Sequence, residues 1–163
     1  MPLPVTYRRA GVEDLAALCQ LGQILNESHH RARPDIYTPA TENFARDEAH
    51  WLPSVSGDSK AVFLAEQGGA AVGFISCQVS RMESPLLQPS VVGRIGSIAV
   101  APAMQGRGVG SALMQHAEAW ARSQGATDIR LVVWSFNDVA MRLYRELGYE
   151  VRTFEMGKPL RAN

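Results

Sequence analysis

The sequence predicts an α/β domain on a mixed β-sheet whose first half is antiparallel. Apolar residues recur at spacings of three and four between Val12 and Leu25, which is typical of a helix that packs on a core. Residues 61–79 instead hold two β-rich runs that are joined by a Gly-Gly pair, a strong hairpin signal. Residues 91–134 then show a strand, a helix and a strand, which predicts a right-handed crossover between parallel strands.

The first half of the chain alternates between helical and extended patterns. Glu13 and Asp14 fall in the first turn of the predicted helix, where negative charge is favoured. In order, we expect a strand at 5–9, a helix from 12 that breaks at 28–35, a helix at 41–51 with Thr41 as its N-cap, a loop at 53–59, and strands at 61–66 and 71–79.

The second half holds the parallel part of the sheet. Gly93 and Gly96 lie inside a strand pattern and indicate a β-bulge or a close approach of a ligand or another backbone. We expect a loop at 84–90, a strand at 91–100, a helix at 106–123 closed by Gly125, an apolar strand at 128–134 that is buried on both faces, a helix at 137–147 closed by Gly148, and two extended pieces within 149–160.

Composition and charge exclude several classes of protein. The 163 residues suit one domain, and they include 16 basic and 16 acidic side chains, so the net charge gives no sign of nucleic-acid binding. No apolar run is long enough to span a membrane, and the N-terminus lacks the apolar core of a signal peptide. Cys19 and Cys77 have no metal-ligand spacing and are interpreted as buried free thiols. We therefore expect a cytoplasmic protein without a metal, a nucleic-acid partner or a membrane partner.

A glycine-rich turn is the most informative feature of the sequence. Residues 105–111 read Gln-Gly-Arg-Gly-Val-Gly-Ser, and they follow an apolar strand and a break at Ala101-Pro102. Glycines allow a backbone to approach an anion closely, and the helix that begins here offers unpaired N–H groups and the positive end of its dipole. This order of elements predicts a site for a phosphate-bearing cofactor. A Walker phosphate loop is a poor match because no lysine follows the last glycine.

Two motifs in this sequence resemble those of the GCN5-related N-acetyltransferase family. Gln105, Gly108 and Gly110 match its acetyl-CoA-binding pattern. The second motif lies in residues 137–149 and matches at Asn137, Ala140, Tyr144, Gly148 and Tyr149. The resemblance covers roughly residues 4–161 as one domain. It implies the family's fold, a mixed and mostly antiparallel sheet with splayed central parallel strands that is flanked by helices.

The resemblance implies an acetyl-CoA-dependent N-acetyltransferase that moves the acetyl group to a primary amine, of a small molecule or of a peptide, by direct attack in a ternary complex. Residues 98–100 would pair with the pantetheine arm like an added strand, and the turn would hold the pyrophosphate. The implied cofactor-binding residues are Ile98, Ala99, Val100, Gln105, Gly106, Arg107, Gly108, Val109, Gly110, Ser111, Asn137 and Tyr144. Asn137 also suits a helix N-cap, and Tyr144 also suits core packing.

The proton chemistry is assigned only in part. Tyr144 is similar to the family tyrosine that donates a proton to the departing thiolate. Many relatives hold a carboxylate in the strand before the turn, but here that strand carries Arg94, Gly96 and Ser97. A direct base is therefore in doubt. The candidates for a base or a water relay are Glu27, His29, His30 and Glu83.

The acceptor side of the site is less defined. In the family, the segment between the first two helices usually forms one side of the acceptor site. Here this segment is residues 26–38, and its candidates to contact the substrate are Glu27, His30 and Tyr37. Acidic side chains there would favour a cationic amine, whereas Arg31 and Arg33 would favour a carboxylate. A catalytically silent CoA-binding sensor or scaffold is the alternative to an enzyme. The resemblance is also compatible with a homodimer.

Overall fold

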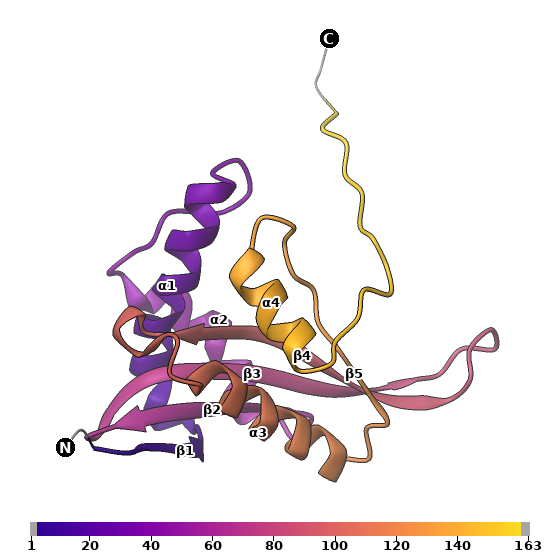
Figure 1. Ribbon diagram of the computed structural model, residues 1–163, viewed down its shortest axis with the longest axis horizontal. Helices are drawn as coiled ribbons and strands as arrows, with labels where there is room; N and C mark the ends of the chain where they lie inside the picture. Colours follow the sequence, from indigo (N-terminus) through magenta and orange to yellow (C-terminus); the bar gives the residue numbers. More distant parts are fainter. Residues whose placement is uncertain (1–2, 161–163) are drawn as a thin grey trace. The chain divides into compact units, whose positions relative to one another are not determined.

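A mixed five-stranded sheet organises the chain up to Val132 in the computed structural model, which describes residues 3–160. The strand order is β1-β2-β3-β4-β5 (Figure 1). The strands are β1 (Val5–Arg9), β2 (Lys60–Gln67), β3 (Ala70–Met82), β4 (Ser90–Val100) and β5 (Asp128–Arg130). The pairs from β1 to β4 are antiparallel and the β4–β5 pair is parallel, so the predicted mixed sheet is confirmed.

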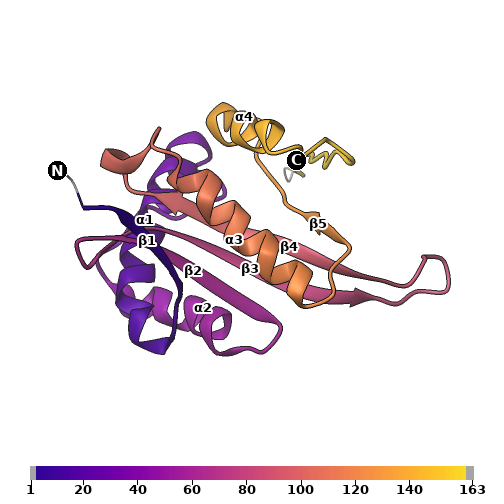
Figure 2. The same ribbon diagram turned by 60° about the horizontal axis from the view of Figure 1, so that its bottom comes forward.

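Helices cover both faces of this sheet (Figure 2). The helices of this unit are α1 (Leu15–Ala32), which follows a 3-10 turn η1 (Val12–Asp14), α2 (Phe44–Ser56), and α3 (Val109–Ser123), which follows a 3-10 turn η2 (Pro102–Met104). Phe74 on β3 packs edge-on against Trp51 of α2. A side chain at the adjacent Gly73 would instead meet Leu113 of α3. Because successive strand residues face opposite ways, α2 and α3 lie on opposite faces.

A second compact unit begins at Val133. It holds α4 (Asp138–Glu146), and residues 149–160 after that helix belong to no helix or strand. None of the helices within residues 3–160 is long and apolar enough to cross a membrane. Both cysteines are buried and free, as predicted.

The predicted ends of the N-terminal helices were wrong in three places. α1 runs on through Ser28 to Ala32 because no breaker interrupts it before Pro34. α2 begins at Phe44, so Thr41 is not its N-cap; the Thr41 hydroxyl oxygen instead accepts a hydrogen bond from the N–H of Asn43. α2 also continues through Pro53, which the pattern had placed in a loop.

The predicted strand at 128–134 is much shorter than expected. Its ladder with β4 joins residues 92–94 to residues 128–130 and ends there. Val132 is 73% exposed, so burial on both faces is wrong for this segment. The extended pieces expected in 149–160 form no ladder among the described residues, and β5 is therefore an edge strand. Apolar character alone does not make a strand where no neighbour supplies hydrogen bonds.

Arg8 ties β1 to two neighbouring elements through charged hydrogen bonds. Its guanidinium donates to both carboxylate oxygens of Asp14, at 2.8 and 2.7 Å, and to those of Glu66, at 3.0 and 2.8 Å. Asp14 also accepts from the N–H of Gly11 at 2.9 Å. The hydrogen bonds from Arg8 hold the pKa of Asp14 below its ordinary value of 3.8.

We expect Asp14→Asn to lower the free energy of unfolding by about 1 kcal/mol at pH 7, because Arg8 is partly exposed and solvent weakens the pair. A lowered native pKa stabilises the fold above the unfolded pKa, and this contribution is lost as the pH falls through the native pKa. The difference between the two proteins should therefore shrink below about pH 4. Urea denaturation at pH 7 and at pH 3 measures this difference in the free energy of unfolding. The control is Asp58→Asn, at an exposed residue, which should leave the free energy of unfolding unchanged at both pH values. An equal loss in the control would mean that the contacts of Asp14 with Arg8 are not responsible.

Candidate functional site

The glycine turn adopts the left-handed backbone that only glycine takes readily. Gly106 has φ 72° and Gly108, which is the N-cap of α3, has φ 80°. A side chain at either position would meet no atom within 4 Å, so the turn faces open space. The Gln105 side-chain amide donates to the Val100 carbonyl at 3.0 Å and ties the turn to the end of β4.

The backbone N–H groups of this turn are available for an anion. Within residues 3–160, none of those from Gly106 to Ser111 donates to a backbone carbonyl, and the first helical bond runs from Ala112 to the Gly108 carbonyl at 3.0 Å. These groups lie at the positive end of the dipole of α3, a helix of 15 residues. The exposed Arg107 lies in the same turn. The turn therefore suits a phosphate group.

The end of β4 has an open backbone edge. β3 pairs with β4 up to Val100, but on the other side the ladder to β5 ends at Arg94. Among the described residues, Ile98, Ala99 and Val100 thus have no strand neighbour on the β5 side. An extended ligand that carries amide groups could add to this edge as another strand does.

β4 contains a β-bulge at Gly96, one of the two glycines that indicated a bulge in the sequence. Ile75 pairs with Ile98 and Cys77 with Ile95, so Gly96 and Ser97 together face Ser76. The Ser97 N–H donates to the Ser76 hydroxyl oxygen at 2.9 Å. A Cβ at Gly96 would lie 2.8 Å from this hydroxyl, so a larger residue here would displace the Ser76 side chain.

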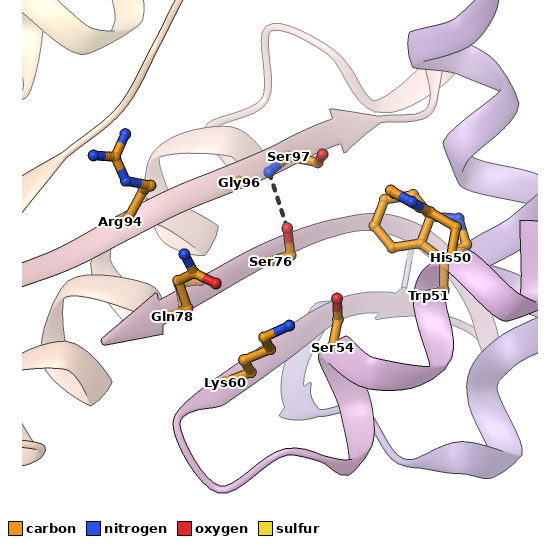
Figure 3. A pocket seen from close by; sticks show the side chains of 10 residues that line it. His50, Trp51, Ser54, Lys60, Ser76, Gln78, Arg94, Gly96 and Ser97 are labelled. Carbon is orange, nitrogen blue, oxygen red and sulfur yellow. Dashed lines mark hydrogen bonds between the residues drawn. The ribbon is translucent and has the colours of Figure 1, made fainter. Parts of the chain in front are cut away.

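A cavity of about 310 Å³ lies beside this bulge, between α2 and the sheet. Figure 3 shows its lining side chains, which come from α2 and from three neighbouring strands. The polar side chains that define it are His50, Ser54, Lys60, Gln78, Arg94 and Ser97. Trp51 and Cys77 also line it, and burial raises the pKa of the Cys77 thiol to about 12, so this cysteine is not a nucleophile at neutral pH.

The predicted acceptor residues lie together at the C-terminal end of α1. One ring nitrogen of His30, Nδ1, is 2.7 Å from the Tyr37 carbonyl oxygen, and the ring of Tyr37 lies 4.7 Å from that of His29. Burial lowers the pKa of His29. Glu27 is exposed and accepts a hydrogen bond from Arg31 at 3.0 Å. Glu27 and Asp35 in this segment thus each form an exposed ion pair with a nearby arginine.

Glu83 lies at the other end of the β3–β4 ladder from the glycine turn. Met82 pairs with Ser90, whereas Gly73 pairs with Val100. At about 3.3 Å per residue, these two ends of β4 are roughly 30 Å apart. The exposed Glu83 follows Met82 and lines a separate cavity of about 270 Å³. The register thus does not bring Glu83 to the turn.

The second unit carries the other motif. The Asn137 side-chain oxygen accepts a hydrogen bond from the Ala140 N–H at 3.1 Å, so its role as N-cap of α4 is confirmed. Tyr144 is 8% exposed, and its ring lies 5.9 Å from that of Tyr149. Burial raises the pKa of the Tyr144 phenol, which therefore keeps its proton at neutral pH.

Sequence reasoning missed most of the cavity. Lys60, Gln78 and Arg94 come from three strands, and only the register shows that they are neighbours. The one available signal was Gly96, which predicted a bulge or a close approach. Among residues 3–160, no group of His, Cys, Asp and Glu side chains is arranged to hold a metal ion.

Comparison with known proteins supports the resemblance. The family model "Acetyltransferase (GNAT) family" matches residues 20–149. An uncharacterized N-acetyltransferase of Methanocaldococcus jannaschii is 30% identical over 123 residues, which are 76% of this chain and 53% of the relative. The chain thus spans about half the length of that relative.

Solved structures share the fold. A mutant of the BH1408 protein of Bacillus halodurans gives a TM-score of 0.85 at 22% identity, over 96% of this chain and 99% of that one. The aminoglycoside N-acetyltransferase AAC(6')-Iy in complex with CoA gives 0.75 at 20% identity, over 99% and 98% of the two chains. With a family model that matches most of its length, this chain belongs to the GNAT acetyltransferase family.

Proposed function

We propose that this protein transfers the acetyl group of acetyl-CoA to a primary amine by direct attack in a ternary complex. The observation that carries the proposal is the turn from Gly106 to Ser111, whose N–H groups donate to no backbone carbonyl within residues 3–160 and lie at the start of α3. Family membership and the CoA complex of a protein with the same fold support acetyl-CoA as the donor.

The donor would bind along β4 and onto the turn. The open edge of Ile98–Val100 would pair with the amides of the pantetheine arm, as an added strand does. The pyrophosphate would accept hydrogen bonds from the turn, with Gln105 fixing the turn to β4 and Arg107 adding a positive charge. Asn137, as in the family motif, would lie beside the cofactor.

The neutral amine nitrogen forms a bond to the thioester carbonyl carbon, the carbon–sulfur bond breaks, and the departing thiolate takes the phenol proton of Tyr144. The nitrogen loses one proton as it becomes an amide, and this proton, passed through water, restores the phenol of Tyr144. The attacking ammonium must first lose a proton. Because β4 holds no acid, we propose a water relay for this step, with Glu27 as the carboxylate on α1; the register leaves Glu83 far from the turn.

Thiol release tests this function directly. Incubation of the protein with acetyl-CoA and a panel of amines should release free CoA thiol with at least one amine, and mass spectrometry should find that amine heavier by one acetyl group. Acetyl-CoA with no amine is the control. Tight CoA binding with no release for any amine would instead favour the alternative, a silent CoA-binding module.

A further inference from the structure

We propose that the cavity between α2 and the sheet binds a carboxylate of the acceptor, so that the preferred substrates are amines that also carry a carboxylate. This inference rests on the proposed function and names the substrate class of that reaction. The carboxylate partners would be Lys60 and Arg94. These residues belong to none of the motifs that indicate the donor.

The sheet register places the two cations in one row. Lys60 on β2 pairs with Gln78 on β3, and Gln78 pairs with Arg94 on β4. Directly paired residues share a face of the sheet, and strands lie about 4.8 Å apart. Lys60 and Arg94 therefore flank Gln78 with their backbones roughly 10 Å apart. Figure 3 shows the Arg94 guanidinium turned away from Lys60, so one small anion would contact both cations after a change of the Arg94 rotamer.

This row faces α2. A side chain at Gly93 would meet Ala121 of α3, so the adjacent Arg94 stands on the opposite face. His50 and Ser54 of α2 line the same cavity from the helix side (Figure 3). The cavity thus has a floor of Lys60, Gln78 and Arg94 and a polar wall on the helix.

The charge of this cavity has one sign. Lys60 and Arg94 line it, no aspartate or glutamate does, and within residues 3–160 neither cation forms an ion pair with a carboxylate. Elsewhere in the described chain, arginines such as Arg8, Arg31 and Arg33 do form ion pairs with acids. Two unpaired cations in a concave site attract an anion and repel amines with several positive charges.

The cavity also lies next to the expected acetyl group. Its lining includes Gly96 and Ser97, which directly precede the edge Ile98–Val100 proposed for the pantetheine arm. From Arg94 to Ile98 the strand advances by roughly 13 Å. An acceptor whose carboxylate contacts Arg94 or Lys60 can therefore extend its amine along β4 toward the thioester.

Matched pairs of acceptors test the proposal. Each pair consists of an ω-amino carboxylic acid and its primary carboxamide, with chains of two to five methylenes, which differ only in the negative charge. We expect kcat/KM to favour the acid by roughly 10- to 100-fold at one chain length or more. The double variant Lys60→Gln with Arg94→Gln should lose this preference, mainly through KM, and high salt should weaken it in the unmodified protein.

Arg81→Gln is the matched control, because Arg81 is an exposed arginine on β3 outside this cavity, and it should keep the preference. Turnover of the amides with no preference for the acids would overturn the carboxylate site and leave the proposed function standing. If no amine reacts, calorimetric titration of the same pairs into the CoA-saturated protein decides the question. Tighter binding of the acids that the double variant abolishes supports the site, and equal or absent binding overturns it.

Discussion

Tyr144→Phe is expected to lower kcat by roughly 10²- to 10⁴-fold while the Kd for acetyl-CoA stays nearly the same. The phenol is 8% exposed, and burial raises its pKa, so it carries a proton wherever the protein is assayed near neutral pH. Phenylalanine keeps the ring and removes the proton that the thiolate would take. Stopped-flow thiol release at saturating acetyl-CoA measures kcat, and calorimetry measures Kd.

Tyr149→Phe is the matched control for this loss. Tyr149 lies in the same unit, its ring is 5.9 Å from that of Tyr144, and the substitution removes the same atom. Either variant could lose about 1 kcal/mol of stability, which thermal denaturation would report. A fall in kcat for both variants would indicate a structural effect, and an unchanged kcat for Tyr144→Phe would show that another group protonates the thiolate.

Local chemistry explains which parts of the fold could be predicted. Gly68 and Gly69 have positive φ at the β2–β3 turn, and Gly125 and Gly148 have positive φ just after α3 and α4. At such positions one residue type fixes the backbone, so the sequence indicates the turn directly. The same reasoning located the turn before α3, although α3 itself begins at Val109 rather than at Gly106.

Non-local pairing explains what could not be predicted. The apolar run after Arg130 was interpreted as a buried strand, but a strand needs a hydrogen-bonded neighbour, and the ladder to β4 ends at residues 94 and 130. The acceptor cavity could not be predicted for the same reason. Lys60, Gln78 and Arg94 are far apart in the sequence, and each alone resembles an ordinary surface residue; only the register joins them.

Gly108→Ala is expected to raise the Kd for acetyl-CoA by about 5- to 30-fold. Gly108 has φ 80°, a conformation that costs an alanine roughly 1–2 kcal/mol, and that free energy corresponds to this range of affinity. A new methyl group would meet no atom within 4 Å, so the effect cannot arise from a clash within the protein. The turn would relax to a negative φ and redirect the N–H groups that the pyrophosphate needs. Calorimetric titration with acetyl-CoA measures the change.

Gly125→Ala separates this effect from a general loss of stability. Gly125 has φ 85° and equally open surroundings, but it lies at the other end of α3, which at 15 residues is about 22 Å long. The same strain there should lower the melting temperature and leave the Kd for acetyl-CoA unchanged. If the two variants bind acetyl-CoA equally well, the turn before α3 is not the phosphate site. If only Gly108→Ala binds weakly, the backbone of this turn holds the donor, because Arg107 and every other side chain are the same in both proteins.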